Sequence, residues 1–459
     1  MRVALLYLTP EGVNTWVAGV GSVINSNFKA LPEAARKLAG DGVELSVFFA
    51  TPAAGPSVRG WNPGQMEKAQ AVAASLGGGV RLLPNYTDGT DNFGRLDQWR
   101  VASAAGAEYA YEVASRFERT VVLAHSSHPF ALAPVYIDMQ RDLVGVDVTT
   151  VYIIHSTSIQ DRTFTYKGGK YPDHERAMVE GLAVQWAKST DSVKLGYISH
   201  YMAHHLMREH GARLDTLVPT LNGVDVNDPH FKLLPEGKRK QVLEKYGVPT
   251  DRPLLVSWGR FVPEKGFAQV LDATARSGAK LHPVIVGMVD HSPEYPAKVV
   301  EFAKGLGLPH SIVVERDWEL VAALLEWKHT RVAALMSAYD EPHGLVVNEA
   351  RMHAREGGPV VVVSNRGGLP EQVTDGVDGF VADIDDLDSA AATIAKAAAL
   401  SDKEHAKMRA ASMETIKNRY DFAENIAMTV RAALGLARYP IKDVLHRPWE
   451  ERDSAWFEG

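Results

Sequence analysis

The chain has 459 residues and is too long for a single ordinary hydrophobic core. This length fits two domains of about 200 residues each. Its formal net charge of −7, without a Lys/Arg-rich run, argues against a nucleic acid as the main partner. The absence of cysteine excludes disulfides, thiol nucleophiles and thiolate metal sites. No apolar run reaches the about 18 residues typical of a membrane span, so stable membrane insertion is not expected.

The N-terminal half is predicted to alternate strands and helices. The apolar run 3–8 predicts a strand rather than a signal peptide, so we expect a cytoplasmic protein. A glycine-containing loop over 9–22 follows, then helical spacing over 25–38 and a second strand over 43–49. Later strands are expected at 80–83, 120–124, 149–154, 192–198 and 216–219. Strands that alternate with helices indicate a parallel α/β sheet.

The same alternation restarts in the second half. The lysine-rich helix 236–246 and the prolines behind it predict a linker region. Strands are then expected near 254–256, 283–286, 311–315, 332–336, 360–364 and 379–382. We therefore expect an N-terminal Rossmann-like domain of residues 1–235, a C-terminal Rossmann-like domain of residues 236–425, and a C-terminal segment of residues 426–459.

Two pairs of charged residues in the second half carry the strongest chemical signal. Arg260 and Lys265 lie five residues apart in a glycine-flanked turn after an apolar strand. Arg holds a diphosphate through its planar fork and Lys holds it as a point charge. Glu341 and Glu349 have seven residues between them, and carboxylates accept hydrogen bonds from ribose or sugar hydroxyls. Cations beside carboxylates are what a sugar nucleotide needs.

Together with a third motif, these residues carry a family resemblance. The stretch 258–382 resembles the C-terminal half of the retaining GT-B glycosyltransferases of family 4 (glycosyl transferases group 1). The matching residues are Gly259-Arg260 with Glu264-Lys265-Gly266, Glu341-Pro342 with Gly344-Leu345-Val346 and Glu349-Ala350, and Gly367-Gly368-Leu369-Pro370-Glu371 with Asp375-Gly376 and Gly379-Phe380. The resemblance implies an α/β GT-B fold: an N-terminal acceptor-binding domain faces a C-terminal nucleotide-sugar-binding domain across a cleft. A C-terminal helix crosses back to the N-terminal domain.

The resemblance also implies four catalytic residues. Arg260 and Lys265 correspond to the pair that binds the diphosphate, where two fixed cations stabilise the charge left on the departing phosphate. Glu341 corresponds to a carboxylate near the donor sugar. His125 follows an apolar strand and aligns with the active-site histidine, which in the family lies near the C6 hydroxyl of the donor sugar.

Further donor-binding residues are expected in both halves. Glu349 corresponds to the ribose-binding carboxylate, and a helix that begins after Gly344 would turn backbone N–H groups towards the phosphates. Ile24 occupies the third position of the G-x-G loop, which argues against a dinucleotide-binding fingerprint. Asp317, in the region of the base pocket, hints at guanine. The full donor-binding set is Gly19, Gly21, His155, Arg316, Asp317, His343, Gly344, Leu345, Val346 and Glu349.

The expected function is retaining transfer of a sugar from a GDP- or UDP-linked donor to a small soluble acceptor, with specialised-metabolite biosynthesis as the expected context. No carboxylate is placed as a nucleophile, so we expect a front-face mechanism without a catalytic metal or cofactor. Two alternatives remain open: a nucleotide-sugar epimerase on the same fold, and a non-catalytic sugar-nucleotide-binding subunit.

Two patterns that could suggest a metal site are interpreted otherwise. Asp383 and Asp385 form a D-x-D pattern, but they follow a strand and are expected at the surface. The group around His204, His205 and His210 matches neither H-E-x-x-H nor its inverse, so we expect a helix surface there.

Overall fold

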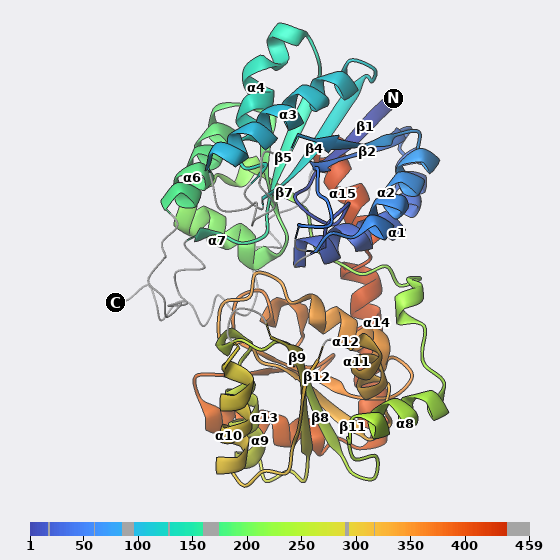
Figure 1. The fold of residues 1–459 in the computed structure, drawn as a ribbon, viewed down its shortest axis with the longest axis vertical. Coiled ribbons are helices and arrows are strands. Elements are labelled where there is room, and N and C mark those ends of the chain that lie inside the picture. Colours follow the sequence, from blue (N-terminus) through green and yellow to red (C-terminus); the bar gives the residue numbers. More distant parts are fainter. Residues whose placement is uncertain are drawn as a thin grey trace. The chain divides into compact units, whose positions relative to one another are not determined.

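The computed structural model describes residues 1–16, 19–58, 60–84, 96–126, 129–158, 174–289, 293–315 and 317–437. The chain forms two compact units, one of Met1–Asp225 with Asp421–Gly459 and the other of Val226–Tyr420 (Figure 1). No helix in the described part is long and apolar enough to cross a membrane.

The first unit contains a seven-stranded parallel sheet with the strand order β3-β2-β1-β4-β5-β6-β7. Its inner strands are continuous apolar runs because helices cover the sheet, as in other parallel sheets. The strands are β1 (Arg2–Leu8), β2 (Glu44–Pro52), β3 (Gly79–Leu83), β4 (Arg119–Ser126), β5 (Val148–Ile154), β6 (Val193–Tyr197) and β7 (Leu217–Pro219). The helices are α1 (Gly19–Ala39), α2 (Pro63–Ser75), α3 (Leu96–Ala114), α4 (Ala133–Val144), α6 (His174–Ser189), α7 (His200–His210) and α15 (Phe422–Ala433).

The second unit contains a six-stranded parallel sheet with the order β10-β9-β8-β11-β12-β13. Its strands are β8 (Leu254–Arg260), β9 (His282–Met288), β10 (Ser311–Val314), β11 (Thr330–Leu335), β12 (Val360–Ser364) and β13 (Phe380–Ala382). Its helices are α8 (Glu236–Lys245), α9 (Phe267–Arg276), α10 (Tyr295–Gly305), α11 (Trp318–Leu325), α12 (Leu345–Ala354), α13 (Leu387–Ala398) and α14 (Asp402–Arg419). Two separate apolar clusters cover the two faces, and successive strand residues such as Leu255 and Val256 belong to different clusters.

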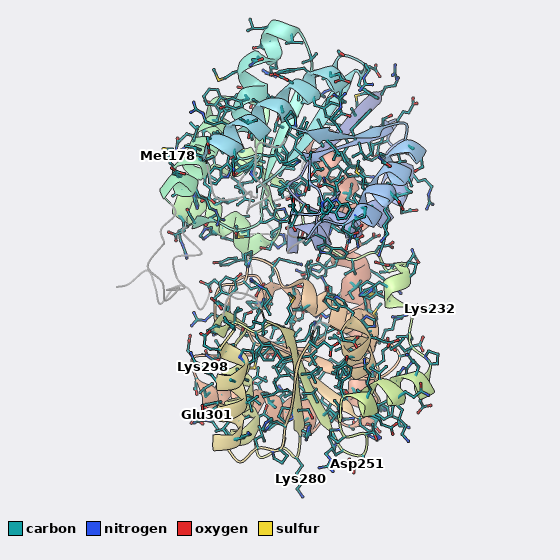
Figure 2. All side chains as sticks on the ribbon, in the orientation of Figure 1. Met178, Lys232, Asp251, Lys280, Lys298 and Glu301 are labelled. Carbon is teal, nitrogen blue, oxygen red and sulfur yellow. The ribbon has the colours of Figure 1, made fainter. Side chains whose placement is uncertain are left out.

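Each sheet has an amino edge and a carboxyl edge, and the candidate functional residues lie at the carboxyl edges. In the second unit the amino edge is marked by the exposed Asp251 and Lys280, which precede β8 and β9 (Figure 2). Ligands of open parallel α/β sheets bind beyond the carboxyl ends of the strands. The fold therefore places the motif residues where such a sheet binds ligands.

The chain returns to the first unit through α15, which packs against α1 and β7. The Thr429 hydroxyl donates to the carbonyl of Pro219 (2.8 Å) and the Phe422 N–H donates to the carbonyl of Val224 (3.1 Å). This is the C-terminal helix that the fold prediction placed on the N-terminal domain.

The observed boundaries differ from the expected ones. They fall at 225/226 and 420/421, whereas the sequence analysis placed them at 235/236 and 425/426. Residues 226–235 belong to the second unit because their backbone is bonded there: Leu234 N–H donates to the carboxylate of Glu326 (2.7 Å), and Arg355 donates to the carbonyl of Phe231 (2.7 Å).

Candidate functional site

The turn after β8 presents Arg260 and Lys265 at the carboxyl edge of the second sheet. Arg260 is the last residue of β8, and Lys265 ends a short 3-10 helix, Pro263–Lys265. Gly266 follows with φ +67°, and a Cβ there would lie 1.9 Å from the carbonyl oxygen of Met336. Only glycine allows this close approach to the end of β11, so the E-K-G pattern fixes Lys265 in place.

Lys265 and Glu341 form an ion pair at this edge. The Lys265 Nζ donates to Glu341 Oε2 at 2.8 Å, and the side chains are 19% and 14% exposed. The hydroxyl of Ser337 donates to the same oxygen at 2.7 Å. Burial alone would raise the pKa of Glu341, but Lys265, Ser337 and the more distant Arg260 together hold it below its usual value. Glu341 is therefore ionised at neutral pH.

The glycine pair of the third motif holds the backbone of Glu341. Gly368 N–H donates to the Glu341 carbonyl at 2.7 Å, and Gly367 N–H donates to a side-chain oxygen of Asp340 at 3.2 Å. Gly367 has φ +55°, and a Cβ there would lie 2.3 Å from the Glu341 carbonyl oxygen. Glu341 and Gly367, 26 positions apart in the chain, thus belong to one structural unit.

Helix α12 begins at Leu345, as the sequence predicted, and Gly344 is its N-cap. The Gln372 amide is oriented so that its oxygen accepts from Gly344 N–H and its nitrogen donates to the Gly344 carbonyl, both at 3.2 Å. One of the three N–H groups expected to face phosphates is therefore engaged by Gln372. The N–H groups of Leu345 and Val346 lie in the first helical turn, which offers no intrahelical acceptor.

Glu349, in the second turn of α12, is a half-buried residue whose carboxyl oxygen Oε2 is buried and unused. Its Oε2 has no hydrogen-bond partner among the described residues, and burial raises its pKa to about 7. The Trp258 indole lowers that pKa slightly, although its N–H is not in hydrogen-bonding geometry with Glu349. A buried carboxyl group without a partner is costly, and a ligand hydroxyl would relieve that cost.

His343 is buried near the Glu341 carboxylate. Burial lowers its pKa to about 4, so the ring is neutral, and neither ring nitrogen has a hydrogen-bond partner within the part of the chain that the structure describes. Its ring centroid lies 6.0 Å from that of Tyr420. The ring fills space against an aromatic side chain and keeps two nitrogens unused.

Asp317 has a structural role that the sequence analysis did not foresee. Its Oδ1 accepts from the N–H groups of Glu319 (2.8 Å) and Leu320 (3.2 Å), which caps α11. Its Oδ2 accepts from the Tyr246 hydroxyl at 2.6 Å. Both oxygens are therefore engaged, which removes support for guanine recognition by this residue. Arg316, the neighbouring candidate, lies outside the described residues.

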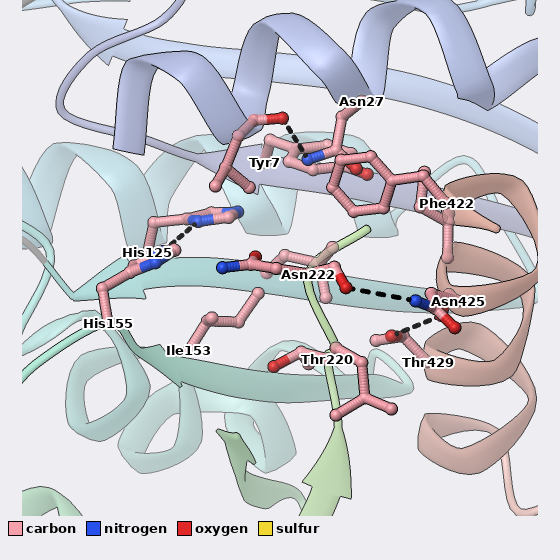
Figure 3. A pocket seen from close by; sticks show the side chains of 14 residues that line it. Tyr7, Asn27, His125, Ile153, His155, Thr220, Asn222, Phe422, Asn425 and Thr429 are labelled. Carbon is pink, nitrogen blue, oxygen red and sulfur yellow. Dashed lines mark hydrogen bonds between the residues drawn. The ribbon is translucent and has the colours of Figure 1, made fainter. Parts of the chain in front are cut away.

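In the first unit, His125 and His155 lie together at the carboxyl ends of β4 and β5. His125 Nδ1 and His155 Nε2 are 2.9 Å apart, and the two rings stack at 5.2 Å and 18° (Figure 3). The Tyr7 ring stacks on the other side of His125 at 5.8 Å. Burial, and the neighbouring His155, lower the pKa of His125 well below its usual range, and burial lowers the pKa of His155 to about 4. Both predicted histidines are therefore neutral.

These rings form one wall of a pocket with about 370 Å³ of atom-free space, part of it open to solvent. The pocket lies between the sheet, α1, the segment after β7, and α15 (Figure 3). Its lining residues are Tyr7, Val23, Asn27, Leu123, His125, Ile153, His155, Thr220, Leu221, Asn222, Phe422, Asn425, Ile426 and Thr429. Of these residues only the two histidines were predicted from the sequence, because the pocket joins six separate segments.

Gly19 and Gly21 do not form the loop that was expected. They lie in the first turn of α1, which begins at Gly19 rather than near residue 25. A Cβ at Gly21 would lie 2.7 Å from the Trp16 ring and 3.0 Å from a carboxylate oxygen of Glu11. Close packing of the helix start explains glycine at position 21, and neither glycine lines the pocket with His125.

The patterns set aside as metal sites have other partners. Among the described residues no group of three or more His, Cys, Asp or Glu could hold a metal ion. Asp383 accepts from the amide of Asn365 (2.9 Å), and Asp385 pairs with Arg366. The expectation of a helix surface was wrong for His205, which is buried and bonded to the hydroxyl of Thr157 at 2.7 Å.

The second unit is similar in sequence to known proteins. Residues 238–415 match the family described as glycosyl transferases group 1. Trehalose synthase of Rubrobacter xylanophilus is 31% identical over 230 residues, which cover 46% of this chain and 51% of that protein. D-inositol 3-phosphate glycosyltransferase of Mycolicibacterium smegmatis is 30% identical over 219 residues, 46% of each chain. The chain spans about half the length of the curated relatives that it matches.

Solved structures resemble nearly the whole chain. Sucrose-phosphate synthase of Thermosynechococcus elongatus has a TM-score of 0.64 at 17% identity, covering 95% of this chain and 100% of that one. An Anabaena protein in complex with UDP-glucose has a TM-score of 0.61 at 18% identity, covering 94% and 99%. At this level of identity the likeness shows the fold, and it confirms the predicted GT-B fold.

Proposed function

Because residues 238–415 are a glycosyl transferases group 1 domain, we propose that the protein transfers a sugar from a nucleoside-diphosphate sugar to an acceptor, with retention of configuration. Two observations carry the proposal: Lys265 pairs with Glu341, and Glu349 on the following helix has a buried carboxyl oxygen without a partner among the described residues. This set offers positive charge for a diphosphate and acceptors for hydroxyl groups.

Lys265 and Arg260 would bind the diphosphate of the donor. A lysine ammonium has three N–H donors, and the hydrogen bond to Glu341 uses one, so Lys265 can bind phosphate oxygens without leaving its partner. The N–H groups of Leu345 and Val346 at the start of α12 add a further anion-binding element. Positive charge fixed at this point stabilises the departing diphosphate most strongly in the transition state.

Glu349 would bind the ribose of the donor. Two ribose hydroxyls can donate to its carboxylate, and these bonds would favour the ionised form that burial disfavours in the free protein. Solved proteins of this fold contain UDP, UDP-glucose or UDP-2-fluoro glucose. With guanine recognition by Asp317 no longer supported, UDP-linked sugars are the first donors to test, before GDP-linked ones.

The proposed chemistry is a front-face substitution. The bond from the anomeric carbon to the phosphate oxygen breaks, the acceptor oxygen bonds to the same face of that carbon, and the acceptor proton passes to the departing phosphate oxygen. Arg260 and Lys265 supply the positive charge for this step, so we propose that no catalytic metal takes part. Turnover that survives exhaustive treatment with EDTA would agree with this, and turnover that requires an added divalent cation would contradict it.

A nucleotide-binding and turnover experiment tests the proposal. The full chain is heated with UDP, GDP, ADP and TDP and with their common sugar conjugates; a ligand at 100 times its Kd stabilises the native state by about 2.7 kcal/mol. Lys265→Ala should lose this stabilisation and about 10²–10³ in turnover while still folding. Lys280→Ala, an exposed lysine at the opposite edge of the same sheet, should behave like the wild type. Normal turnover in Lys265→Ala would exclude the assignment.

Product analysis separates the two alternatives. An epimerase would release a new sugar nucleotide without any acceptor, and a non-catalytic binder would be stabilised by nucleotide yet turn over with no acceptor in the panel. Transfer to an acceptor, with the anomeric configuration of the donor, is the outcome that the proposal requires.

A further inference from the structure

Among the described residues, no formally charged side chain lines the pocket of the first unit. None of its 14 lining residues is Asp, Glu, Lys or Arg (Figure 3). His125 and His155, which could add charge, are held neutral by burial and by their contact with each other. An ionic ligand group in this pocket would therefore lose its hydration without gaining a counter-charge.

Three residues that line the pocket each have a buried polar atom without a hydrogen-bond partner among the described residues. They are the Tyr7 hydroxyl, the Nε2 atom of His125 and the Thr220 hydroxyl. The three residues are 1%, 2% and 9% exposed, and they come from the ends of β1 and β4 and from the segment after β7. A buried polar atom without a partner costs about 1–3 kcal/mol, so three around one pocket indicate a place that is completed by a ligand.

Apolar side chains complete the lining. Phe422 and Ile426 on α15 lie opposite Leu123 and Ile153 on the sheet. A mainly apolar lining with a few convergent polar groups is typical of small-molecule sites. An apolar lining with isolated polar atoms suits a compact ligand that has an apolar ring or chain and hydroxyl groups at its edge.

We propose that this pocket binds the uncharged, hydroxyl-bearing part of the acceptor, and that phosphorylated and amino-substituted groups are excluded from it. The inference rests on the proposed glycosyl transfer and adds the chemical class of the acceptor.

A hydroxyl group is the ligand group that fits all three atoms. Tyr7 and Thr220 can each donate or accept, whereas His125 Nε2 does one or the other, as set by which histidine donates in the bond between His125 and His155. A hydroxyl both donates and accepts, so it satisfies His125 in either tautomer. Among the described lining residues, a phosphate would meet no cation and an ammonium group would meet no carboxylate.

Binding of small probes to the full chain tests the class. Glycerol, glucose and myo-inositol are titrated calorimetrically in parallel with glucose 6-phosphate and glucosamine, in the absence of nucleotide. At least one neutral polyol should bind, and the charged probes should bind at least about tenfold more weakly, the scale of one unsatisfied polar group. Equal or tighter binding of a charged probe would overturn the proposal, as would a panel in which no neutral polyol binds and the pocket holds water only.

Matched variants locate the binding in the pocket. Thr220→Val and Tyr7→Phe each remove one hydroxyl and keep the shape, so each should weaken polyol binding by about 3- to 10-fold. Thr120→Val is the control, since Thr120 is also buried with an unpartnered hydroxyl but lies at the start of β4, away from the pocket. Polyol affinity that is unchanged in both Thr220→Val and Tyr7→Phe would refute the assignment.

The nucleotide panel keeps the two proposals separate. Stabilisation by UDP should persist in Thr220→Val, because Arg260, Lys265 and Glu349, which are proposed to bind the diphosphate and the ribose, belong to the second unit. A wild-type protein that binds nucleotide but none of the neutral polyols would overturn the pocket proposal alone. Polyol binding without any nucleotide response or glycosyl transfer would overturn the proposed function instead.

Discussion

Replacing Glu349 by Gln should stabilise the free protein at neutral and alkaline pH and weaken nucleotide binding. In the wild type the carboxyl group is buried near Trp258, one oxygen has no partner in the described structure, and the pKa is raised to about 7. Ionising this group inside the fold costs free energy, whereas Gln has nearly the same shape and no charge. In the complex, ribose hydroxyls would offset that cost for Glu349.

The size of this effect follows from the difference between the Glu349 pKa in the folded protein, about 7, and its usual pKa of 4.5. Between these values the folded state of the wild type binds more protons than the unfolded state, so wild-type stability falls as the pH rises through this window. The wild type loses about 3 kcal/mol of stability at most, at about 1.4 kcal/mol per pH unit. Glu349→Gln has no carboxyl group at this position and does not lose this stability. Because each kcal/mol shifts Tm by about 2–4 °C in a domain of 150–250 residues, the variant should melt up to about 6–12 °C higher at pH 8.

Calorimetry at pH 4 and pH 8 measures this effect. The Tm values of wild type and Glu349→Gln should nearly coincide at pH 4, where both side chains are neutral. At pH 8 the Tm of Glu349→Gln should be the higher one. Glu356→Gln, at an exposed position just after α12, is the control and should match the wild type at both pH values. An equal Tm difference at the two pH values would refute the burial argument. Full nucleotide stabilisation in Glu349→Gln would refute the ribose assignment.

Three further substitutions test the framework around the ion pair. Ser337→Ala removes a hydrogen bond to Glu341 and so raises the pKa of Glu341. The acid limb of the pH–rate profile should therefore move to higher pH, with a several-fold loss of turnover. An acid limb at the wild-type pH would count against this positioning role of Ser337. Gln372→Leu leaves both backbone groups of Gly344 without their partner, so urea denaturation should show a loss of about 1–3 kcal/mol, and unchanged stability would contradict that arrangement. Gly266→Ala meets positive φ and a carbonyl oxygen at 1.9 Å; we expect a loss of about 2 kcal/mol or more in thermal unfolding, and a wild-type Tm would show that the turn is not so constrained.

The fold could be predicted because its signals are local. Short apolar runs alternate with helical spacing, and a parallel sheet buried on both faces produces such runs in every inner strand. The helix start after Gly344 could be predicted for the same reason, since proline and glycine mark helix boundaries within a few residues. Patterns that depend on neighbours in sequence therefore gave both sheets and the position of α12.

Errors arose where side-chain packing overrides the preferences of the local sequence. Glycines at 19 and 21 favour a loop by propensity, but the start of α1 packs so closely on Trp16 that position 21 has no room for a side chain. His205 was expected on a helix surface, yet a threonine 48 residues earlier gives it a buried partner. Neither contact has a signal in the residues around it.

Asp317 and Glu349 show why residue type and motif position do not settle function. Both are carboxylates that the resemblance placed near the nucleotide. Two backbone N–H groups and a tyrosine hydroxyl already engage Asp317, so the fold needs it with or without a ligand. Glu349 is buried with an unused oxygen and a raised pKa, which the fold alone does not explain. The buried group that lacks a partner is the one that points to a ligand, and by this criterion the ribose assignment gains support while the guanine assignment loses it.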